Sequence, residues 1–154
     1  MAEIPIRCGA VCLVAVRRSK EVNEVLLLRR TRSLQGEWCQ IAGGIEDGET
    51  AWQAAVRELK EETSLHPDAV YSGDICEQFY EAHRDAISLL PVFVAYIDAE
   101  SEPRLNAEHS DYRWVDFNTA YEMVPFVGQR HVLRHVEREF MLATPSKHLK
   151  IELR

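Results

Sequence analysis

The segment GGIEDGETAWQAAVRELKEETSL, residues 43–65, joins a glycine-rich loop to a stretch with helical periodicity. Its glutamates Glu58, Glu61 and Glu62 are spaced i, i+3, i+4, which places three carboxylates on one face of a helix. Like charges at this spacing destabilise a helix by about 0.2–0.5 kcal/mol per pair. A divalent cation reverses this effect, because hard cations such as Mg²⁺ prefer carboxylate oxygens. The segment therefore predicts half of a metal site.

This helix has recognisable ends and a core-facing side. Thr50 and Gln53 have the spacing of a capping box, in which each side chain bonds the backbone N–H of the other residue. Ser64 is expected to end the helix. The stripe at i, i+3, i+4 and i+7 is expected to face the core, and it consists of Trp52, Ala55, Val56 and Leu59.

The same segment resembles a known family motif. After Gly43 come five residues, Glu49, seven residues and then REL-K-EE-T-S-L, residues 57–65. This is similar to the Nudix box, G-x5-E-x7-R-E-U-x-E-E-x-G-U, in which U is aliphatic. Every specified position matches except Ser64, where the pattern has glycine. The resemblance to Nudix hydrolases implies an α+β fold, the Nudix α/β/α sandwich, with a mixed β-sheet, the box loop-helix and a C-terminal helix.

The rest of the chain predicts elements that suit such a fold. Strands are expected at residues 9–16, 24–30, 38–42, 68–80, 86–97 and 112–117, and further helices at 118–123 and 127–141. The first two strands should form a hairpin, and Pro91 should mark a sheet edge or a bulge. This order indicates α+β with helices covering a mixed sheet, and 154 residues suit a single domain, residues 1–154.

Composition narrows the classes of partner. The net charge of −7 argues against a nucleic-acid polymer. No apolar run is long enough to span a membrane, and residues 1–10 lack a signal-peptide layout. The cysteines form no C-x-x-C pair, and we expect Cys8 and Cys12 to be buried free thiols. These features predict a cytoplasmic protein with no nucleic-acid or membrane partner, and they leave its oligomeric state open. The resemblance to Nudix hydrolases implies a small-molecule partner.

The resemblance implies Mg²⁺ as cofactor, with Mn²⁺ as an alternative, and hydrolysis of a phosphoanhydride bond. It assigns as metal ligands Glu58, Glu61, Glu62 and Glu108. Glu108 is included because Glu108-His109 precedes a Tyr-Arg-Trp strand, where the family often carries an acid that faces the box helix. Without the resemblance, Glu108 would be an ordinary loop glutamate.

Catalytic roles are implied by the same resemblance. The base that activates water is Glu58, Glu61 or Glu108, and the three remain open. Arg57 is expected to orient the glutamates through charge-assisted hydrogen bonds, with Glu49 as its partner.

Substrate contacts are expected on both sides of the box. Arg29 and Arg30 end a strand on opposite faces, so one of them is placed to reach a phosphate, and we assign Arg29. A surface ion pair is the alternative role. Residues 31–33 either hold a phosphate or serve as ordinary loop. The remaining predicted substrate contacts are Ala42, Gly43 and Gly44.

One further pair has metal-ligand spacing. His131 and His135 are i, i+4 on the last helix, but the glutamate of H-E-x-x-H is missing. We therefore expect a solvated or core-edge pair.

The run from Trp38 to Thr50 is similar to W-Q-x-x-T-G-S-x-E-x-G-E-T of dihydroneopterin triphosphate pyrophosphatases, also called dATP pyrophosphohydrolases. Ala42 and Gly44 depart from that pattern. The expected substrate is therefore a nucleoside triphosphate or a related pterin triphosphate, cleaved to the monophosphate and pyrophosphate. The alternatives are hydrolysis of ADP-ribose or dinucleoside polyphosphates, and a non-catalytic nucleotide-sensing domain.

Overall fold

The computed structural model describes residues 1–153. One mixed sheet contains the long strands β2 (Ala10–Ser19), β3 (Val22–Arg30), β6 (Ala69–Glu81), β7 (Ala86–Tyr96) and β8 (His109–Asp116). Its short strands are β1 (Ile6–Arg7), β4 (Trp38–Cys39), β5 (Ile41–Gly44) and β9 (Lys150–Ile151). The helices are α1 (Ala51–Thr63), α2 (Phe117–Met123) and α3 (Val127–Val136), with a π-helical turn η1 (Glu137–Met141) and a 3-10 turn η2 (Lys147–Leu149).

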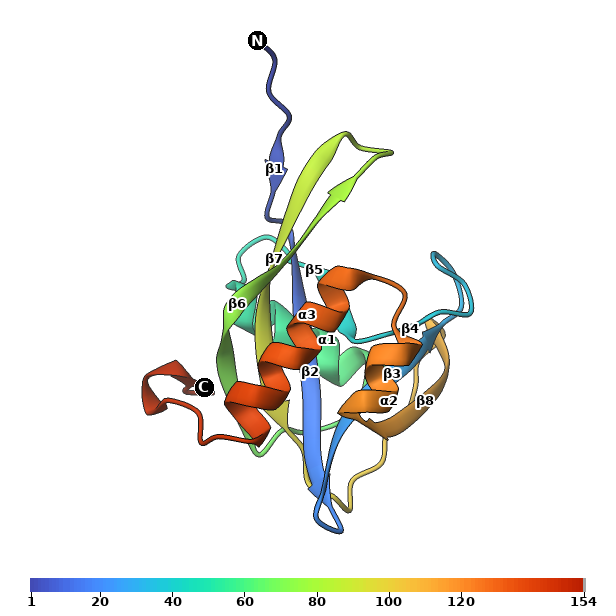
Figure 1. Ribbon diagram of the computed structural model, residues 1–154, viewed down its shortest axis with the longest axis vertical. Helices are drawn as coiled ribbons and strands as arrows, with labels where there is room; N and C mark the ends of the chain where they lie inside the picture. Colours follow the sequence, from blue (N-terminus) through green and yellow to red (C-terminus); the bar gives the residue numbers. More distant parts are fainter. Residues whose placement is uncertain (154) are drawn as a thin grey trace.

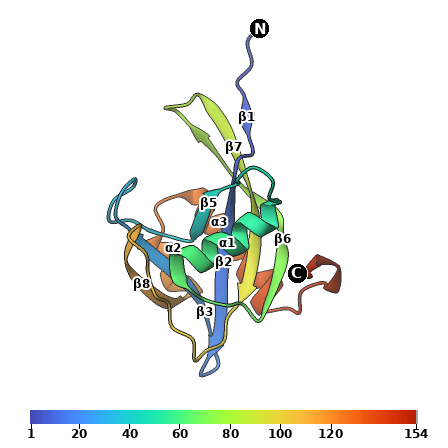
Figure 2. The same cartoon turned by 180° about the vertical axis from the view of Figure 1, so that it is seen from behind.

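The sheet lies between two helical layers. α2 and α3 cover the face seen in Figure 1, and α1 covers the face seen in Figure 2. Alternate residues of β2 serve the two layers, because successive side chains of a strand point to opposite faces. Val11, Leu13 and Ala15 pack on the α1 side, and Cys12, Val14 and Val16 pack on the α2–α3 side. This double burial explains the unbroken apolar run and confirms the predicted α/β/α sandwich.

The strand order is β4-β3-β2-β7-β6-β9, with β2 parallel to β7 and antiparallel to β3. Two pairings off this path position the site. β5 pairs with β2, with Gly43 opposite Val11, and β8 pairs with β3, with His109 opposite Arg30. The glycine loop and the segment around residues 108–109 are thereby fixed to one region of the sheet.

Two predicted features of the sheet are present, a hairpin and a break in strand pairing near Pro91. The β2–β3 hairpin turns at Lys20 and Glu21, whose φ angles of 51° and 67° suit a tight two-residue turn. Pro91 lies opposite Cys76, directly beside the irregular pairing of β6 between Ser72 and Cys76. A residue without an N–H is tolerated beside such a break in the ladder.

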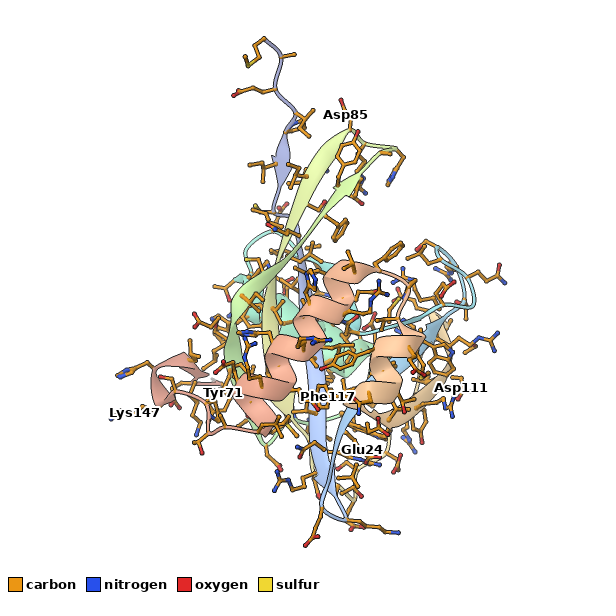
Figure 3. All side chains as sticks on the ribbon, in the orientation of Figure 1. Glu24, Tyr71, Asp85, Asp111, Phe117 and Lys147 are labelled. Atoms are coloured by element: carbon orange, nitrogen blue, oxygen red, sulfur yellow. The ribbon has the colours of Figure 1, made fainter. Side chains whose placement is uncertain are left out.

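Several boundaries differ from expectation; β2, for example, runs to Ser19 and not to residue 16, because its pairing with β3 continues to the hairpin turn. β8 begins at His109, not residue 112, because it pairs with the end of β3. The last helix covers the expected residues, but α3 gives way at Glu137 to the π-helical turn. Figure 3 shows Phe117 buried between α2 and the sheet, and Asp85 at the tip of the projecting β6–β7 hairpin.

All four cysteines are free thiols, as predicted for Cys8 and Cys12, but the predicted burial of Cys8 is wrong. Cys12 is buried, but Cys8 is exposed, because it precedes the first residue of β2 and lies outside the packed layers. Within residues 1–153, every helix falls short of the length and apolarity needed to cross a bilayer.

Both ends of α1 follow from its sequence. The Gln53 N–H donates to Thr50 Oγ1 at 3.2 Å, and the Thr50 N–H donates to Gln53 Oε1 at 2.7 Å, which confirms the capping box. At the other end Ser64 has φ 61° and ψ 13°, and its N–H donates to the Lys60 carbonyl at 2.8 Å. Serine therefore occupies the left-handed conformation that glycine adopts most easily.

The Ser64→Gly variant is expected to be as stable as the parent or slightly more stable, with unchanged turnover. Relief of the left-handed strain, about 1 kcal/mol, is largely offset by the greater chain entropy of glycine. Thermal melts check this, with Ser64→Ala as a control that keeps the Cβ atom and should gain nothing. A clear loss of stability in Ser64→Gly would reveal a contact of the Ser64 side chain and contradict the prediction.

Candidate functional site

The glycine loop passes directly over α1 at Gly43. A Cβ atom added to Gly43 would overlap the carboxylate of Glu58. The φ angle of Gly43 is not in the left-handed region, so glycine is required here for space and not for backbone conformation. Glycine at this position lets the loop backbone lie against Glu58, the first of the three box glutamates.

Arg57 ties the loop to the helix. Its Nε and Nη2 donate to the two carboxylate oxygens of Glu49 at 3.1 and 2.6 Å, which confirms the predicted pair. Nη1 donates to Glu58 Oε1 at 2.8 Å, and Nη2 also donates to the Gly44 carbonyl at 2.8 Å. The hydrogen bonds from Arg57 lower the pKa of Glu49, and those to the glutamates raise the pKa of Arg57. The guanidinium therefore remains charged and holds Glu58 in place.

Glu62 carries the strongest electrostatic strain of the site. Its side chain is 3% exposed, and Oε2 has no hydrogen-bond partner. Burial, followed by repulsion from Glu58 and Glu108, raises its pKa to about 9. Burial also raises the pKa of Glu58, against the opposing effect of Arg57. An orphaned carboxylate oxygen among like charges fits a bound cation, which would neutralise the group and supply the missing partner.

Glu108 and His109 meet Glu62 from the other side. One ligand atom from each of the three residues lies within 4.8 Å of the other two. Glu108 is exposed, whereas His109 is 8% exposed and its Nδ1 is buried without a partner. Burial, helped by the charge of Arg30, lowers the pKa of His109 and favours the neutral ring.

Glu61 lies on the flank of this cluster. Its side chain is 53% exposed and approaches Arg57 Nη1 at 3.3 Å. Only Glu58 and Glu62 turn inward, because they are one helical turn apart, and Glu61 is rotated toward solvent. The structure thus brings together Glu58, Glu62 and Glu108 and leaves Glu61 at the edge.

A hollow of about 210 Å³ opens beside the carboxylates. Its lining residues are Arg30, Arg32, Ser33, Ala42, Glu62, Glu108 and His109. Acidic side chains thus face two arginines across one small space. Gly43 and Gly44 are not among the lining residues and act instead through Glu58 and Arg57.

Arg30, not the predicted Arg29, belongs to this hollow. Arg30 donates from Nε and Nη2 to the carbonyl and hydroxyl oxygens of Ser33, both at 2.7 Å. Arg29 instead directs its Nε to the Gly36 carbonyl at 3.4 Å. Strand alternation predicted that one of the two arginines would be placed to reach a substrate phosphate, and the lining of the hollow favours Arg30 over the assigned Arg29.

Thr31 links the arginine loop to Glu108. Its hydroxyl lies 3.0 Å from the Ala107 carbonyl and 2.9 Å from the Glu108 carbonyl. Its N–H also donates to the Glu108 carbonyl at 3.1 Å. The backbone that carries Glu108 is therefore fastened to the loop that carries Arg30 and Arg32.

A larger hollow, of about 290 Å³, lies beside His135 and Phe140. Its lining contains Asp74 and Glu139 but neither arginine nor lysine, so it is poorly suited to phosphate. Nε2 of His135 is 2.6 Å from the Gly73 carbonyl, and His131 is exposed. The two histidines thus occupy the core edge and the solvent, in agreement with the sequence analysis.

Substituting alanine for Gly43 is expected to lower turnover in the expected hydrolysis roughly tenfold while the protein stays folded, because Glu58 is predicted to be catalytic and a small displacement of such a group is costly. The added Cβ must push the Glu58 carboxylate aside. Gly9→Ala is the matched control, since nothing lies within 4 Å of a Cβ atom there. Steady-state turnover and circular dichroism check the pair, and equal turnover in both variants would show that the Gly43–Glu58 contact is unimportant.

These elements can be compared with known proteins. The model of the NUDIX domain matches residues 7–136. The chain belongs to the Nudix family. The match extends well beyond the box and includes Arg30 on β3, Glu108 in the turn before β8, and His109 at the start of β8.

Curated relatives place the Nudix chain among proteins of several activities. It is 34% identical over 134 residues to an octanoyltransferase of Myxococcus xanthus; the match covers 84% of this chain but only 36% of that protein. It is 28% identical over 127 residues to an asymmetrical bis(5′-nucleosyl)-tetraphosphatase of Caenorhabditis elegans, covering 81% of this chain and 91% of the relative.

Solved structures show the same Nudix fold. An Ap4A hydrolase of C. elegans has a TM-score of 0.75 at 23% identity, covering 86% of this chain and 96% of the other. The dihydroneopterin triphosphate pyrophosphohydrolase of E. coli has a TM-score of 0.71 at 24% identity, covering 92% of this chain and all of the other.

Proposed function

We propose that this chain is a divalent-metal-dependent hydrolase that cleaves a phosphoanhydride bond in a nucleoside triphosphate or a related pterin triphosphate. The products are the monophosphate and pyrophosphate. The observation that carries the proposal is the hollow in which Glu62 and Glu108 face Arg30 and Arg32. A site with paired carboxylates and arginines matches a cation together with a polyphosphate.

In this proposal the acidic residues bind the cation and the basic residues bind the phosphate groups. Glu58, Glu62 and Glu108 would hold Mg²⁺ or Mn²⁺, with Glu61 contributing from the exposed flank. When bound, such a cation neutralises charge on phosphate oxygens and makes a nearby water more acidic. Arg30 and Arg32 bind phosphate oxygens directly, and the Arg30 fork is already oriented by Ser33.

We assign proton abstraction to Glu108. It is exposed in the hollow, whereas Glu62 is buried and Glu58 is held by Arg57. A base must reach the attacking water, and Glu108 has the most open position of the three. Arg57 acts as a positioning residue for Glu58.

A dinucleoside tetraphosphate is the second candidate substrate. The observation in its favour is the group of curated relatives named asymmetrical bis(5′-nucleosyl)-tetraphosphatase, which come from C. elegans, rat, mouse and pig. For the compartment, the four free thiols support a reducing one such as the cytoplasm.

A substrate panel tests the proposal. Purified protein with Mg²⁺ or Mn²⁺ is given dATP, dihydroneopterin triphosphate, diadenosine tetraphosphate or ADP-ribose, and products are separated by ion-exchange chromatography. Pyrophosphate plus a monophosphate supports the first reading, and ATP plus AMP from the tetraphosphate supports the second. The Glu62→Gln variant controls for contaminating phosphatases. Tight nucleotide binding without any turnover would contradict a hydrolase and favour a sensing domain.

A further inference from the structure

His109 has a position that the proposed reaction does not yet use. It is almost fully buried, and its Nδ1 has no hydrogen-bond partner. Leaving such an atom unpaired is unfavourable, because it loses its hydrogen bonds to water on burial and gains none in return. Glu62 Oε2 is orphaned in the same way, and both residues belong to the cluster whose ligand atoms lie within 4.8 Å of one another. Two buried polar atoms without hydrogen-bond partners, in one cluster, fit a shared cation that takes an electron pair from each.

The backbone explains how adjacent residues reach one point. Successive side chains in a regular strand point to opposite faces, so Glu108 and His109 would ordinarily diverge. Here the β3–β8 register shifts between Arg29 and Arg30, so that Arg29 pairs with Asp111 but Arg30 pairs with His109. This irregularity, together with the turn at residues 107–108, directs both side chains toward Glu62.

We propose that His109 supplies a nitrogen ligand to the cation held by Glu62 and Glu108, so that the site binds Mn²⁺ in preference to Mg²⁺. This inference rests on the proposed function only in requiring that the hollow holds a divalent cation. Carboxylates serve both ions, whereas an imidazole nitrogen favours first-row transition metals and contributes little to Mg²⁺. His109 thereby sets metal preference, while the glutamates set the overall affinity.

The direct test is pulsed electron paramagnetic resonance of Mn²⁺ bound to the wild-type protein. A coordinated imidazole produces a nitrogen modulation that changes when the protein is labelled with ¹⁵N. We expect this signal in the wild type and its loss in His109→Gln. A bound Mn²⁺ that shows no nitrogen modulation would overturn the proposal, and a bridging water between His109 and Glu62 would then explain the geometry.

Binding measurements give a second readout. Isothermal titration of Mn²⁺ and of Mg²⁺ should show that His109→Gln weakens Mn²⁺ binding by roughly 10–100-fold, the range typical of disturbing a metal's ligand environment. Mg²⁺ binding should change much less, so the Mn²⁺/Mg²⁺ preference falls. His83→Gln, in the exposed turn between β6 and β7, makes the same substitution outside the site and should leave both affinities unchanged. Equal weakening of both ions would also overturn the nitrogen-ligand role.

The outcomes separate this inference from the proposed function. If wild type and Glu62→Gln both fail to bind either ion, the metal site itself is wrong, and both proposals fall. If the wild type binds Mn²⁺ through oxygen ligands alone, only the role of His109 falls. Should His109→Gln not fold, the wild-type spectrum with and without ¹⁵N labelling still decides.

Discussion

Replacing Glu62 with glutamine is expected to lower metal-dependent turnover at least tenfold and, at the same time, to stabilise the metal-free protein. Turnover falls because the most deeply buried ligand charge is lost. Stability rises because a neutral amide of the same shape removes the cost of burying a charge at this position and also ends the repulsion from Glu58 and Glu108. Turnover at saturating Mg²⁺ or Mn²⁺ measures the first effect, and thermal melts in chelator measure the second.

The stability effect has a defined pH dependence. The folded-state pKa of Glu62 is raised to about 9 from an ordinary value of 4.5. The folded protein therefore binds an extra proton between these values, so wild-type stability falls as the pH rises through this window. Each pKa unit corresponds to about 1.4 kcal/mol, so a shift of this size is worth several kcal/mol at the alkaline end.

In Glu62→Gln this slope should be much shallower between pH 5 and about 9. The difference in melting temperature from the wild type should grow with pH and reach several degrees. Glu122→Gln, an exposed substitution on α2, is the control and should keep the wild-type slope. Parallel curves for wild type and Glu62→Gln would show that Glu62 is already ionised and stabilised in the free protein, against the prediction.

Glu108→Gln is expected to lower turnover by roughly 10²-fold or more, the usual scale for loss of a general base. KM should change much less, because Arg30 and Arg32, the proposed phosphate contacts in the hollow, are unaltered. Steady-state kinetics of the wild type and of Glu108→Gln measure turnover and KM. Glu100→Gln, an exposed glutamate of the preceding loop, is the matched control.

The split between the two kinetic constants decides the role of Glu108. A sharp rise in KM with turnover intact would make it a substrate-binding residue. If neither constant changes, Glu108 is an ordinary surface glutamate, and the base must be sought at Glu58 or Glu61.

Local features of the site were predictable because they depend on spacing within one element. The capping box, the exit at Ser64 and the pairing of Arg57 with Glu49 all follow from helical geometry and short separations. The apolar run of β2 predicted a central strand with both faces buried, whereas the α/β/α sandwich was implied by the resemblance to the Nudix family. The family motif could be recognised from 23 residues of sequence because it, too, depends only on spacing within one loop-helix segment.

Features that depend on register between distant strands were not predictable. Whether Arg29 or Arg30 enters the hollow depends on the β3–β8 pairing and its irregularity, which sequence periodicity does not encode. The sequence carries no sign that His109 faces Glu62, because adjacent residues of a regular strand point to opposite faces. The rotation of Glu61 toward solvent also required the packed position of α1.

The fastening of Thr31 to Glu108 has a consequence for selectivity. A substrate group too large for the loop at residues 31–33 must displace that loop, and the hydrogen bonds of Thr31 would carry the backbone of Glu108 with it. A substrate that fits poorly against the loop at residues 31–33 would thus misalign Glu108, the proposed proton acceptor. Ill-fitting substrates should accordingly still bind, yet be turned over slowly, so that discrimination is expressed in kcat more than in KM.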